Sequence, residues 1–336
     1  MKALVTGTSG FVGSAVARRL AASGHEVRVL MRPSSDRRNV EGLDVETVEG
    51  DLERPETLRP AVAGCDAVFH VAADYRLWVT DGGESMYRAN VGGTRDLVRA
   101  AMDAGVSRFV YTSSVAVLRI SPDRRPADET AFATLGDMVS HYKKSKFLAE
   151  EEVRRLVREE DAPVVIVNPS APFGPRDVKP TPTGRIVLDA AKGRMPAYLD
   201  TGLNAVHVDD VAEGHLLAFE RGRIGERYIL GGENLSLRDI IATVTSYVGR
   251  PGPRIRLPRR PLFPVAWAAE LAGRVTGREP PITLDALRMA AKHMYYSSDR
   301  ARAELGYAPR PAAEALTDAV DWYRAHGYLP SASGRT

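Results

Sequence analysis

Residues 2–13, Lys-Ala-Leu-Val-Thr-Gly-Thr-Ser-Gly-Phe-Val-Gly, decide the fold of this chain. They begin with an apolar run, Ala3–Val5, that enters a turn with three glycines: Gly7, Gly10 and Gly13. A helical pattern follows over Val12–Ser23, and a second apolar run comes at Val27–Met31. The order strand, glycine turn, helix, strand is typical of a site that binds the pyrophosphate of a dinucleotide.

Each glycine of the turn has its own expected role. Gly7 allows the tight turn, Gly10 lets the backbone approach a phosphate, and Gly13 lets the helix pack on the strand. The N-terminus of the helix adds unpaired N–H groups and the positive end of its dipole. A glycine turn can also simply connect a strand to a helix. Its place between an apolar run and a helical pattern favours the dinucleotide site.

The first half of the chain alternates short apolar runs with helical patterns. The runs, which predict strands, are Ala3–Val5, Val27–Met31, Val45–Val48, Ala67–Val71, Phe109–Tyr111 and Val164–Val167. The helical patterns are Val12–Ser23, Pro55–Ala63, Asn90–Ala104 and Tyr142–Glu160. Near-continuous apolar strands are typical of a parallel sheet covered on both faces. We therefore predict an α/β fold with a Rossmann-type doubly wound parallel sheet, whose ligands bind at the C-terminal strand ends.

The composition changes after Asn168, where the chain becomes rich in proline and glycine. We expect a dinucleotide-binding domain over 1–168, to which 204–225 returns as a strand and a helix with Asp209 as N-cap. A smaller C-terminal substrate-binding domain would comprise 169–203 and 226–330. The last residues, 331–336, would form a disordered tail.

The bulk composition excludes several classes of protein. The 46 basic and 43 acidic residues nearly balance, which argues against a nucleic-acid binder. Cys65 is the only cysteine, so no intramolecular disulfide can form, and a cytoplasmic location is expected. The sequence shows no signal-peptide pattern and no apolar run of the length of a membrane span, so we expect neither a signal peptide nor a transmembrane helix. His70 and His207 lack accompanying ligands, and Asp209 with Asp210 resembles a capping pair, so no metal site is expected.

Tyr142 and Lys146 form a second candidate site. Positions four apart lie on one face of a helix, and this segment has a helical pattern. A lysine cation beside the phenol would lower the pKa of the tyrosine and make it a better acid–base at neutral pH. The alternative is a half-buried tyrosine at the start of a solvated, basic helix. The dinucleotide turn upstream favours the acid–base interpretation.

Hydroxyl groups follow the strand around Phe109, in Tyr111-Thr112-Ser113-Ser114-Val115. A hydroxyl at the C-terminal end of that strand would lie beside a bound dinucleotide and could hydrogen-bond a substrate carbonyl. The alternative is a serine that caps a helix or a turn.

The residues after the second strand bear on which dinucleotide binds. NAD sites place Asp or Glu at the end of this strand to bind the ribose 2′-hydroxyl. Here Arg32 stands without an acid beside it, and its guanidinium suits a 2′-phosphate. Arg37 and Arg38 add positive charge, whereas Asp36 opposes it. We predict NADP, and the alternative is NAD with a solvated Arg32.

A basic segment precedes an apolar one near the C-terminus. Arg254, Arg256, Arg259 and Arg260 come just before Leu262–Ala272, an apolar helical pattern that contains a tryptophan. We predict that this helix packs within the substrate domain. Contact with a membrane surface is the alternative, because basic residues beside an apolar helix suit anionic lipid.

Ten short motifs, each present once, follow one another along the chain. They are Thr6–Gly13, Gly50–Leu52, His70–Ala73, Asn90–Thr94, Thr112–Ser114, Tyr142 with Lys146, Asn168-Pro169, His207–Val211, Ser298–Ala301 and Glu304–Tyr307. In these motifs the chain resembles the extended short-chain dehydrogenases/reductases, of the sugar epimerase and dihydroflavonol reductase type. Within that family it is similar to the hopanoid-associated sugar epimerases, which look like dihydroflavonol reductases in sequence.

The resemblance implies roles for named residues. Tyr142 would be the general acid–base, Lys146 would hold the nicotinamide ribose and tune Tyr142, and Ser114 would be the catalytic hydroxyl. Asn90 would order the site. The positions that would contact the cofactor are Gly7, Ser9, Gly10, Phe11, Val12, Gly13, Arg32, Asp51, Leu52, Ala72, Ala73, Tyr142, Lys146, Pro169 and Ser170. Members of the family typically dimerise through two long helices, so a homodimer is also expected.

These residues imply reversible hydride transfer between the nicotinamide and a carbonyl or secondary-alcohol carbon. Net reduction with NADPH and epimerisation with retained cofactor would use the same residues, and both stay open. A non-catalytic dinucleotide-binding regulator is a third alternative. The substrate would be a sugar, a nucleotide-sugar or an apolar carbonyl compound, in a pocket lined by Ala73–Trp78, Pro172–Thr183 and Leu199–Leu203.

Overall fold

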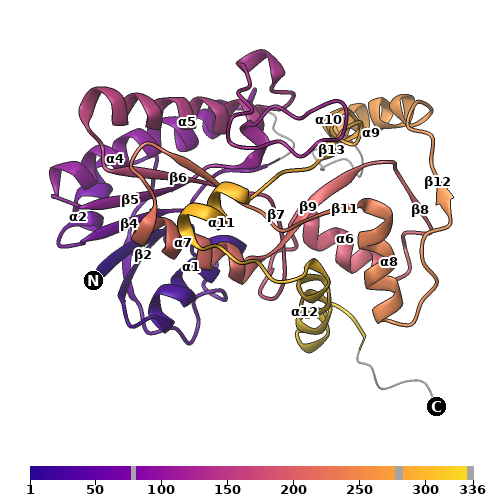
Figure 1. The fold of residues 1–336 in the computed structure, drawn as a ribbon, viewed down its shortest axis with the longest axis horizontal. Helices are drawn as coiled ribbons and strands as arrows, with labels where there is room; N and C mark the ends of the chain where they lie inside the picture. The colour runs from indigo at the N-terminus through magenta and orange to yellow at the C-terminus, as the bar shows by residue number, and fades with distance from the viewer. Residues whose placement is uncertain (77–80, 277–282, 331–336) are drawn as a thin grey trace.

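A parallel sheet of seven strands forms the centre of the larger part of the molecule (Figure 1). The computed structural model describes residues 1–76, 81–276 and 283–330, so Trp78 and the predicted tail over 331–336 lie outside the described residues. The strand order is β10-β6-β5-β4-β1-β2-β3. The strands are β1 (Lys2–Thr6), β2 (Glu26–Met31), β3 (Glu46–Glu49), β4 (Ala67–His70), β5 (Arg108–Thr112), β6 (Val164–Pro169) and β10 (Arg227–Leu230).

The predicted Rossmann-type sheet is confirmed. Each of the six predicted strands lies in it, and every pairing between neighbours is parallel. Every residue of β4 and β6 is buried, which explains why these strands are apolar throughout instead of alternating.

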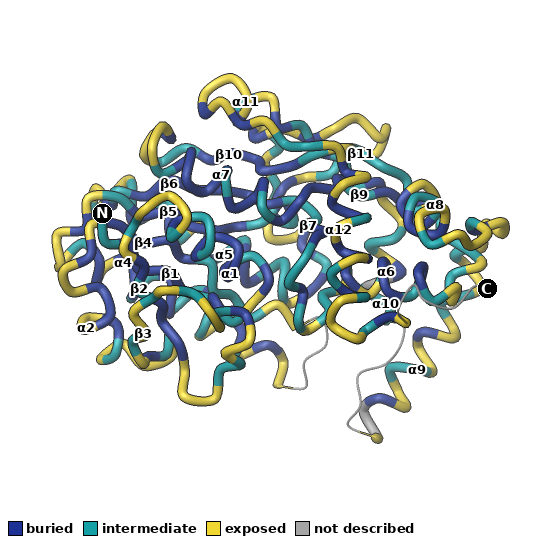
Figure 2. The backbone as a smooth tube through the Cα atoms, turned by 90° about the horizontal axis from the view of Figure 1, so that it is seen from below, coloured by how far each residue is buried: buried dark blue, intermediate teal, exposed yellow. Residues whose placement is uncertain are grey.

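Two layers of helices cover the sheet, and buried residues concentrate between the layers (Figure 2). One face packs against α1 (Phe11–Ala22), α7 (Val208–Arg221) and α11 (Asp299–Leu305). The other face packs against α2 (Leu58–Val62), α4 (Gly93–Asp103) and α5 (His141–Glu160). Short helical turns at Pro55–Thr57 and Arg88–Gly92 lead into α2 and α4, and α3 covers Glu84–Tyr87.

A smaller unit is built around a second sheet, of order β11-β9-β13, with β7 paired to β9. Its elements are β7 (Ala171–Phe173), β9 (Gly202–His207), β11 (Glu233–Ser236), β13 (His293–Met294), α6 (Pro182–Ala191), α8 (Leu237–Tyr247) and α12 (Ala312–Ala325). At its outer edge lie β8 (Ala197–Tyr198), β12 (Ile255–Arg256), α9 (Leu262–Thr276) and α10 (Leu284–Met289). In the described ranges, no helix is long and apolar enough to cross a bilayer.

The chain passes between the two sheets more often than the sequence suggested. Strand β10, which we expected in the substrate domain with 226–330, pairs with β6 in the large sheet. Strand β9, which we expected to return with 204–225, lies in the second sheet, whereas α7 of that segment packs on the large one. The composition does not reveal this exchange, because strand pairing depends on contacts between residues far apart in the sequence.

The N-cap of helix α7 lies two residues before the predicted cap, Asp209. His207 is the N-cap, and its Nδ1 accepts a hydrogen bond from the Asp209 N–H at 3.0 Å. Asp209 forms an ion pair with Arg176 instead of capping the helix. A histidine is an uncommon cap, so the sequence favoured the aspartate.

Candidate active site

The glycine turn between β1 and α1 is fixed by close backbone contacts. Gly7 has a φ of +76°, which favours glycine, and a Cβ there would lie 2.6 Å from the Ala72 nitrogen. A Cβ on Gly13 would overlap the Gly7 carbonyl oxygen. The Gly10 N–H donates to that same oxygen at 2.9 Å. The first turn of the helix therefore closes directly on the glycine turn.

The N-terminus of α1 is open to an anionic ligand. Gly10 caps the helix in an extended conformation, is exposed, and receives no side-chain hydrogen bond in the described chain. The amides of Phe11 and Val12 belong to the first helical turn, which has no internal acceptors, and they lie at the positive end of the helix dipole. The Ser9 carbonyl accepts from the Asn39 side chain at 3.0 Å, which ties the next loop to the turn. A pyrophosphate fits this arrangement.

The loop after β2 is cationic. Arg32 directly follows the strand and is exposed. Asp36, the acid that opposed the NADP prediction, pairs with Arg38 at 2.7 Å and lies 3.6 Å from Lys179. Hydrogen bonds from Arg38 hold the pKa of Asp36 well below its usual range. Arg38 and Lys179 thus balance the charge of Asp36, so this acid does not neutralise Arg32.

The remaining predicted cofactor positions lie along the same edge of the sheet. Asp51 and Leu52 follow β3, Ala72 and Ala73 follow β4, Pro169 ends β6 and Ser170 comes directly after it. The Ala72 N–H donates to the Thr6 hydroxyl at 3.1 Å, which holds the loop after β4 against β1. These positions therefore share the C-terminal edge, where doubly wound sheets bind their ligands.

Ser114 and Tyr142 are brought together from β5 and α5. The Ser114 hydroxyl hydrogen-bonds the Tyr142 phenol, an interaction that lowers the pKa of the phenol, while the larger effect of burial raises it. Ser114 also caps the short turn Val115–Val117, where its Oγ accepts from the Ala116 N–H at 3.1 Å. The capping alternative is therefore observed, and the contact of Ser114 with substrate stays a prediction.

Lys146 lies buried beneath this pair. Its Nζ donates to the Tyr111 hydroxyl at 3.1 Å and to the Thr112 carbonyl at 2.7 Å. Burial lowers the pKa of Lys146 to about 7, against a smaller opposite effect of Glu150. We expected the lysine cation to lower the pKa of Tyr142. In the structure the pKa of Tyr142 is raised by burial, and the hydroxyl that contacts Lys146 is that of Tyr111.

Asn90 connects the loop after β4 to α5. Its Oδ1 accepts from the Asp74 N–H at 2.8 Å, and its Nδ2 donates to the Asp74 carbonyl at 2.8 Å and to Ser145 at 2.9 Å. Ser145 immediately precedes Lys146 on α5. Asn90 therefore ties the loop after β4 to the helix that carries Tyr142 and Lys146.

A buried charged network, which the sequence analysis missed, supports the same strand ends. Glu150 of α5 pairs with Arg227 of β10 at 3.1 Å, and both side chains are buried. Although burial raises the pKa of Glu150, the charges of Arg227 and Arg154 outweigh it and keep the pKa low. Asn168 donates to Glu150 and to the Ser114 carbonyl, both at 3.0 Å. The Asn168-Pro169 motif was the available signal for this network.

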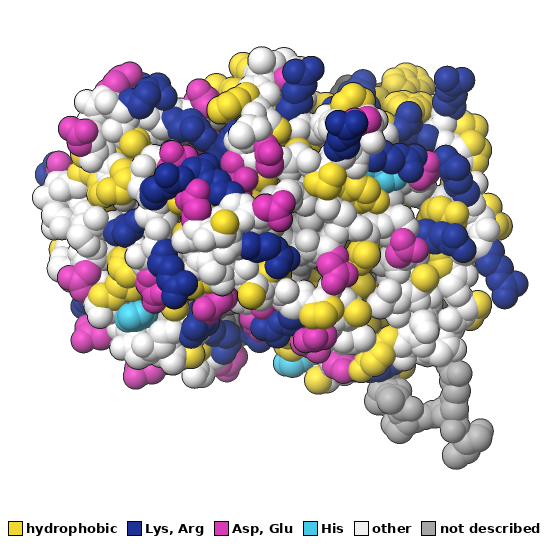
Figure 3. All heavy atoms as spheres, in the orientation of Figure 1, with side chains coloured by type: hydrophobic (Ala, Val, Ile, Leu, Met, Phe, Trp, Pro, Cys, Tyr) yellow, Lys and Arg dark blue, Asp and Glu magenta, His cyan; other side chains and the backbone are white. Residues whose placement is uncertain are grey.

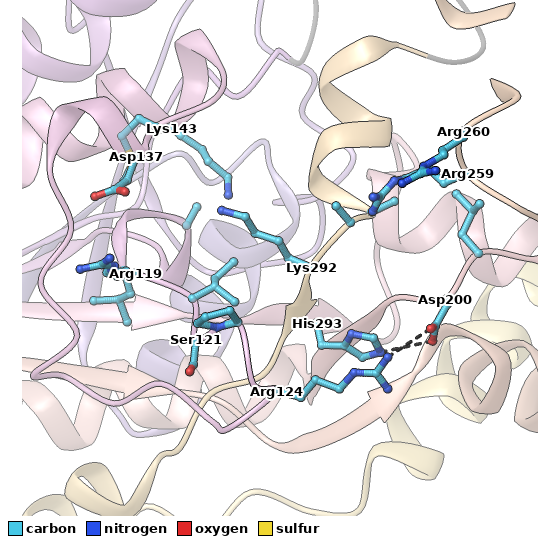
Figure 4. Close-up of a pocket in the computed structure, with 18 of the residues that line it drawn as sticks. Arg119, Ser121, Arg124, Asp137, Lys143, Asp200, Arg259, Arg260, Lys292 and His293 are labelled. Atoms are coloured by element: carbon cyan, nitrogen blue, oxygen red, sulfur yellow. Dashed lines mark hydrogen bonds and ion pairs between the residues drawn. The ribbon is translucent and has the colours of Figure 1, made fainter. Parts of the chain in front are cut away.

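A cavity of about 1020 Å³ adjoins the candidate residues (Figure 4). Its wall contains Ala116, whose N–H donates to Ser114, and Lys143, which directly follows Tyr142. Seven cationic residues line it, against two acids: Arg119, Arg124, Lys143, Arg256, Arg259, Arg260 and Lys292, with Asp137 and Asp200. In Figure 4 the ammonium groups of Lys143 and Lys292 point toward each other, and burial and then Lys292 lower the pKa of Lys143.

The cavity differs from the predicted substrate pocket. Of the predicted lining segments, Leu199–Leu203 contributes Leu199 and Asp200, whereas Pro172–Thr183 does not line it. The cations come from the loop after β5, the start of α5, and the connectors beside α9 and β13, which meet only in the folded chain. Asp200 is itself bound by Arg256 at 2.6 Å and by Arg124 at 3.1 Å.

The two histidines considered as ligands have structural partners. His70 lies between the hydroxyls of Thr6 and Thr94, at 2.8 and 2.9 Å, and burial lowers its pKa to about 3. His207 caps α7 and contacts Asp318 at 3.2 Å. The described residues contain no cluster of three or more His, Cys, Asp or Glu side chains that could hold a metal.

The glycine turn and the ordered motifs match a known sequence family. The model of the NAD dependent epimerase/dehydratase family covers residues 3–231. This chain belongs to that family. It is therefore an NAD(P)-dependent enzyme of the extended short-chain dehydrogenase/reductase type, as the motifs predicted.

Individual relatives match over almost the whole chain. A protein of Synechocystis sp. named "Putative dihydroflavonol 4-reductase" is 43% identical over 97% of this chain and 95% of its own length. The crystal structure of gox2253 is 55% identical, with a TM-score of 0.87, and covers 97% of this chain and 99% of its own. DesIV, a dTDP-glucose 4,6-dehydratase from Streptomyces venezuelae solved with NAD bound, is 25% identical over 98% of this chain and 99% of its own, with a TM-score of 0.77.

Proposed function

We propose that this enzyme is an NADP(H)-dependent reductase that acts on a carbonyl group of an anionic small molecule. The hydrogen bond between Ser114 and Tyr142, close in sequence to Ala116 and Lys143 of the cationic cavity wall, carries this proposal. A ketone oxygen that enters from the cavity would meet both hydroxyl groups at once. Reduction adds a hydride to the carbonyl carbon and a proton to the carbonyl oxygen. Ser114 and Tyr142 would hydrogen-bond that oxygen and supply its proton.

Tyr142 is suited to donate the proton. Since burial raises the pKa of Tyr142, its phenol is protonated at neutral pH, which is the form that reduction requires. The Ser114 hydroxyl stabilises the phenolate that remains after transfer, because this hydrogen bond lowers the pKa of Tyr142. When bound, the nicotinamide supplies the hydride.

The cofactor fits the cradle around α1. Gly7, Ser9, Gly10, Phe11, Val12 and Gly13 would hold the pyrophosphate, and Asp51, Leu52, Ala72, Ala73, Pro169 and Ser170 would border the remainder of the dinucleotide. Arg32 would bind the 2′-phosphate, which favours NADP over NAD. Lys146 would support Tyr142 and the nicotinamide ribose, and Asn90 would keep the loop after β4 in place.

The charge of the cavity argues for an anionic substrate. Seven cations face two acids, and Asp200 is already shared by Arg124 and Arg256. The excess positive charge raises the local concentration of anions and stabilises a bound phosphate or carboxylate. The residues proposed for the cofactor phosphates, on the glycine turn and at Arg32, do not line this cavity, so its charge would serve another group.

Epimerisation of a nucleotide-sugar is a second candidate. It is favoured by the same cationic cavity, which would accept a diphosphate, and by DesIV, whose name specifies a dTDP-sugar. A hopanoid-associated sugar epimerase would be one form of it. Net reduction is preferred because of the protonated Tyr142 and the reductase name of the Synechocystis relative.

Product analysis with NADPH separates these functions. We expect ketones that carry a phosphate or carboxylate to oxidise NADPH stoichiometrically, and neutral analogues to react with higher KM. Tyr142→Phe should bind NADPH and lose turnover, while Tyr247→Phe, an exposed tyrosine on α8, should keep both. Inversion of a nucleotide-sugar without net NADPH oxidation would favour the epimerase. Full activity of Tyr142→Phe would overturn the catalytic assignment.

A further inference from the structure

Helix α9 exposes an apolar surface that the described part of the chain does not cover. Among the described side chains of α9, Ala266 and Gly273 are buried, and the exposed positions are apolar apart from Thr276. The three largest exposed side chains are Trp267, Val265 and Leu271, at 61%, 56% and 50% exposure. We predicted a helix packed within the substrate domain. The structure instead leaves its apolar side facing outward (Figure 2).

The exposed apolar residues form one continuous side of the helix, which we call the α9 face. Its members are Pro264, Val265, Trp267, Ala268, Leu271 and Ala272. Since each residue turns an α-helix by about 100°, these six positions fall within an arc of about 160°. Glu270 lies outside this arc, and its carboxylate accepts from the Leu284 N–H at 2.7 Å, on the side of α10.

The segment before α9 supplies positive charge next to this face. Arg254, Arg256 and Arg260 are exposed, and the apolar side chains of Ile255 and Leu257 between them are 58% and 37% exposed. Figure 3 shows hydrophobic side chains over α9 with Lys and Arg around them. An apolar helix face beside arginines is the arrangement of a helix that lies in the interface of an anionic membrane.

We propose that the α9 face docks on the surface of a membrane that contains anionic lipids. Trp267, Val265 and Leu271 enter the boundary between headgroups and acyl chains, and Arg254, which does not line the cavity, binds a lipid phosphate. A tryptophan on such a face suits this boundary, because its ring is both apolar and able to donate a hydrogen bond. A second copy of the chain fits less well, since an isologous contact through α9 would place both arginine segments beside one interface.

The docking surface also adjoins the wall of the cavity. Residues 256–260 line the cavity and lead directly into α9, and Figure 4 shows Arg259 and Arg260 among the lining residues. A membrane under α9 therefore lies beside the proposed substrate site. The docking itself rests on exposure and charge alone, and holds whether or not the proposed reduction is correct.

Vesicle flotation tests the proposal. The wild-type protein should float with vesicles of phosphatidylcholine and phosphatidylglycerol, bind pure phosphatidylcholine weakly, and detach as salt is added. Trp267→Ser with Leu271→Ser should reduce the partition coefficient by about tenfold or more. Ile224→Ser is the matched control, because Ile224 is 55% exposed on another surface, between α7 and β10. Arg254→Glu, outside the cavity wall, should weaken binding to anionic vesicles only.

Three outcomes would overturn the docking proposal. They are absence of binding at low salt, equal binding by the wild type and the double variant, and equal binding to neutral and anionic vesicles. A wild-type dimer that the double variant dissociates, measured by sedimentation, would assign the face to a second copy. Equal thermal unfolding and equal NADPH affinity of the variants show that the fold and the cofactor site are intact, so failure here is distinguishable from failure of the proposed function.

Discussion

The ammonium nitrogen of Lys146 lies 3.1 Å from the hydroxyl oxygen of Tyr111, two residues before the turn that carries Ser113 and Ser114. It also lies 4.7 Å from the centre of the Tyr111 ring. The buried lysine is therefore held by β5, the strand that also delivers Ser114. Burial raises the pKa of Tyr111 well above its ordinary value, so this phenol stays neutral and acts as an acceptor for the cation.

Tyr111→Phe should change the pH profile of turnover. The substitution removes an acceptor of the Lys146 ammonium, which favours the neutral amine and lowers the pKa of Lys146. Loss of a hydrogen bond to a charged group is worth about 1.5 kcal/mol, so the alkaline limb of kcat/KM should move down by about one pH unit. Tyr228→Phe removes another buried hydroxyl, bonded to Glu304 on the other face, and should leave the profile unchanged. An unchanged alkaline limb in Tyr111→Phe would show that the hydrogen bond from Lys146 to Tyr111 does not affect the pKa of Lys146.

Lys146 should also give the cofactor-free protein a characteristic dependence of stability on pH. The pKa of the folded state is about 7 against 10.5 for an exposed lysine. Between these values the unfolded chain binds a proton that the folded chain does not, so the free energy of unfolding rises with pH. Below about pH 7 both states are charged and the cost of burying the ammonium is fully present.

Comparison with Lys146→Met isolates this contribution. The free energy of unfolding of the wild type, measured by urea denaturation from neutral to alkaline pH, should rise relative to that of the variant. The other titrating groups are common to both proteins and cancel in the difference. Parallel curves would show that the buried lysine keeps its ordinary pKa.

The sequence predicted the parts of this molecule that depend on local patterns. The strands of the large sheet are apolar because both faces are covered, and the glycines at 7, 10 and 13 are required by backbone contacts within the turn. The sequence could not show that β10 completes the large sheet, because its pairing partner β6 lies far away along the chain.

The candidate site was predictable residue by residue but not in its contacts. Spacing placed Tyr142 and Lys146 on one face of α5, yet it could not show that the lysine reaches Tyr111 on β5. The cationic cavity was missed for the same reason, since its cationic residues come from four separate segments. The exposure of Trp267 also needed the fold, because the sequence pattern of a packed apolar helix and of an uncovered one is the same.

Arg32→Glu should exchange the preference between the two dinucleotides. The arginine suits a 2′-phosphate, while a carboxylate at the end of β2 repels it and can accept from a ribose 2′-hydroxyl. We expect the Kd for NADPH to rise by about tenfold or more, with little change or a fall in the Kd for NADH. Fluorescence titration measures both. Arg238→Glu, an exposed arginine on α8, controls for the change in net charge. Equal effects on both cofactors would contradict the role of Arg32.

Gly10→Ala and Gly13→Ala should separate cofactor binding from folding. A Cβ on Gly10 would meet the Gly7 carbonyl oxygen at 3.2 Å and otherwise project from the exposed start of α1, so the fold should tolerate it. The same methyl would occupy the place where a phosphate approaches the helix, and NADPH affinity should fall by about tenfold or more.

A Cβ on Gly13 would overlap the Gly7 carbonyl, so Gly13→Ala should lower the free energy of unfolding of the cofactor-free protein by about 2 kcal/mol or more. Thermal unfolding without cofactor and NADPH titration measure the two effects, and normal NADPH affinity in a folded Gly10→Ala would remove the pyrophosphate from the glycine turn.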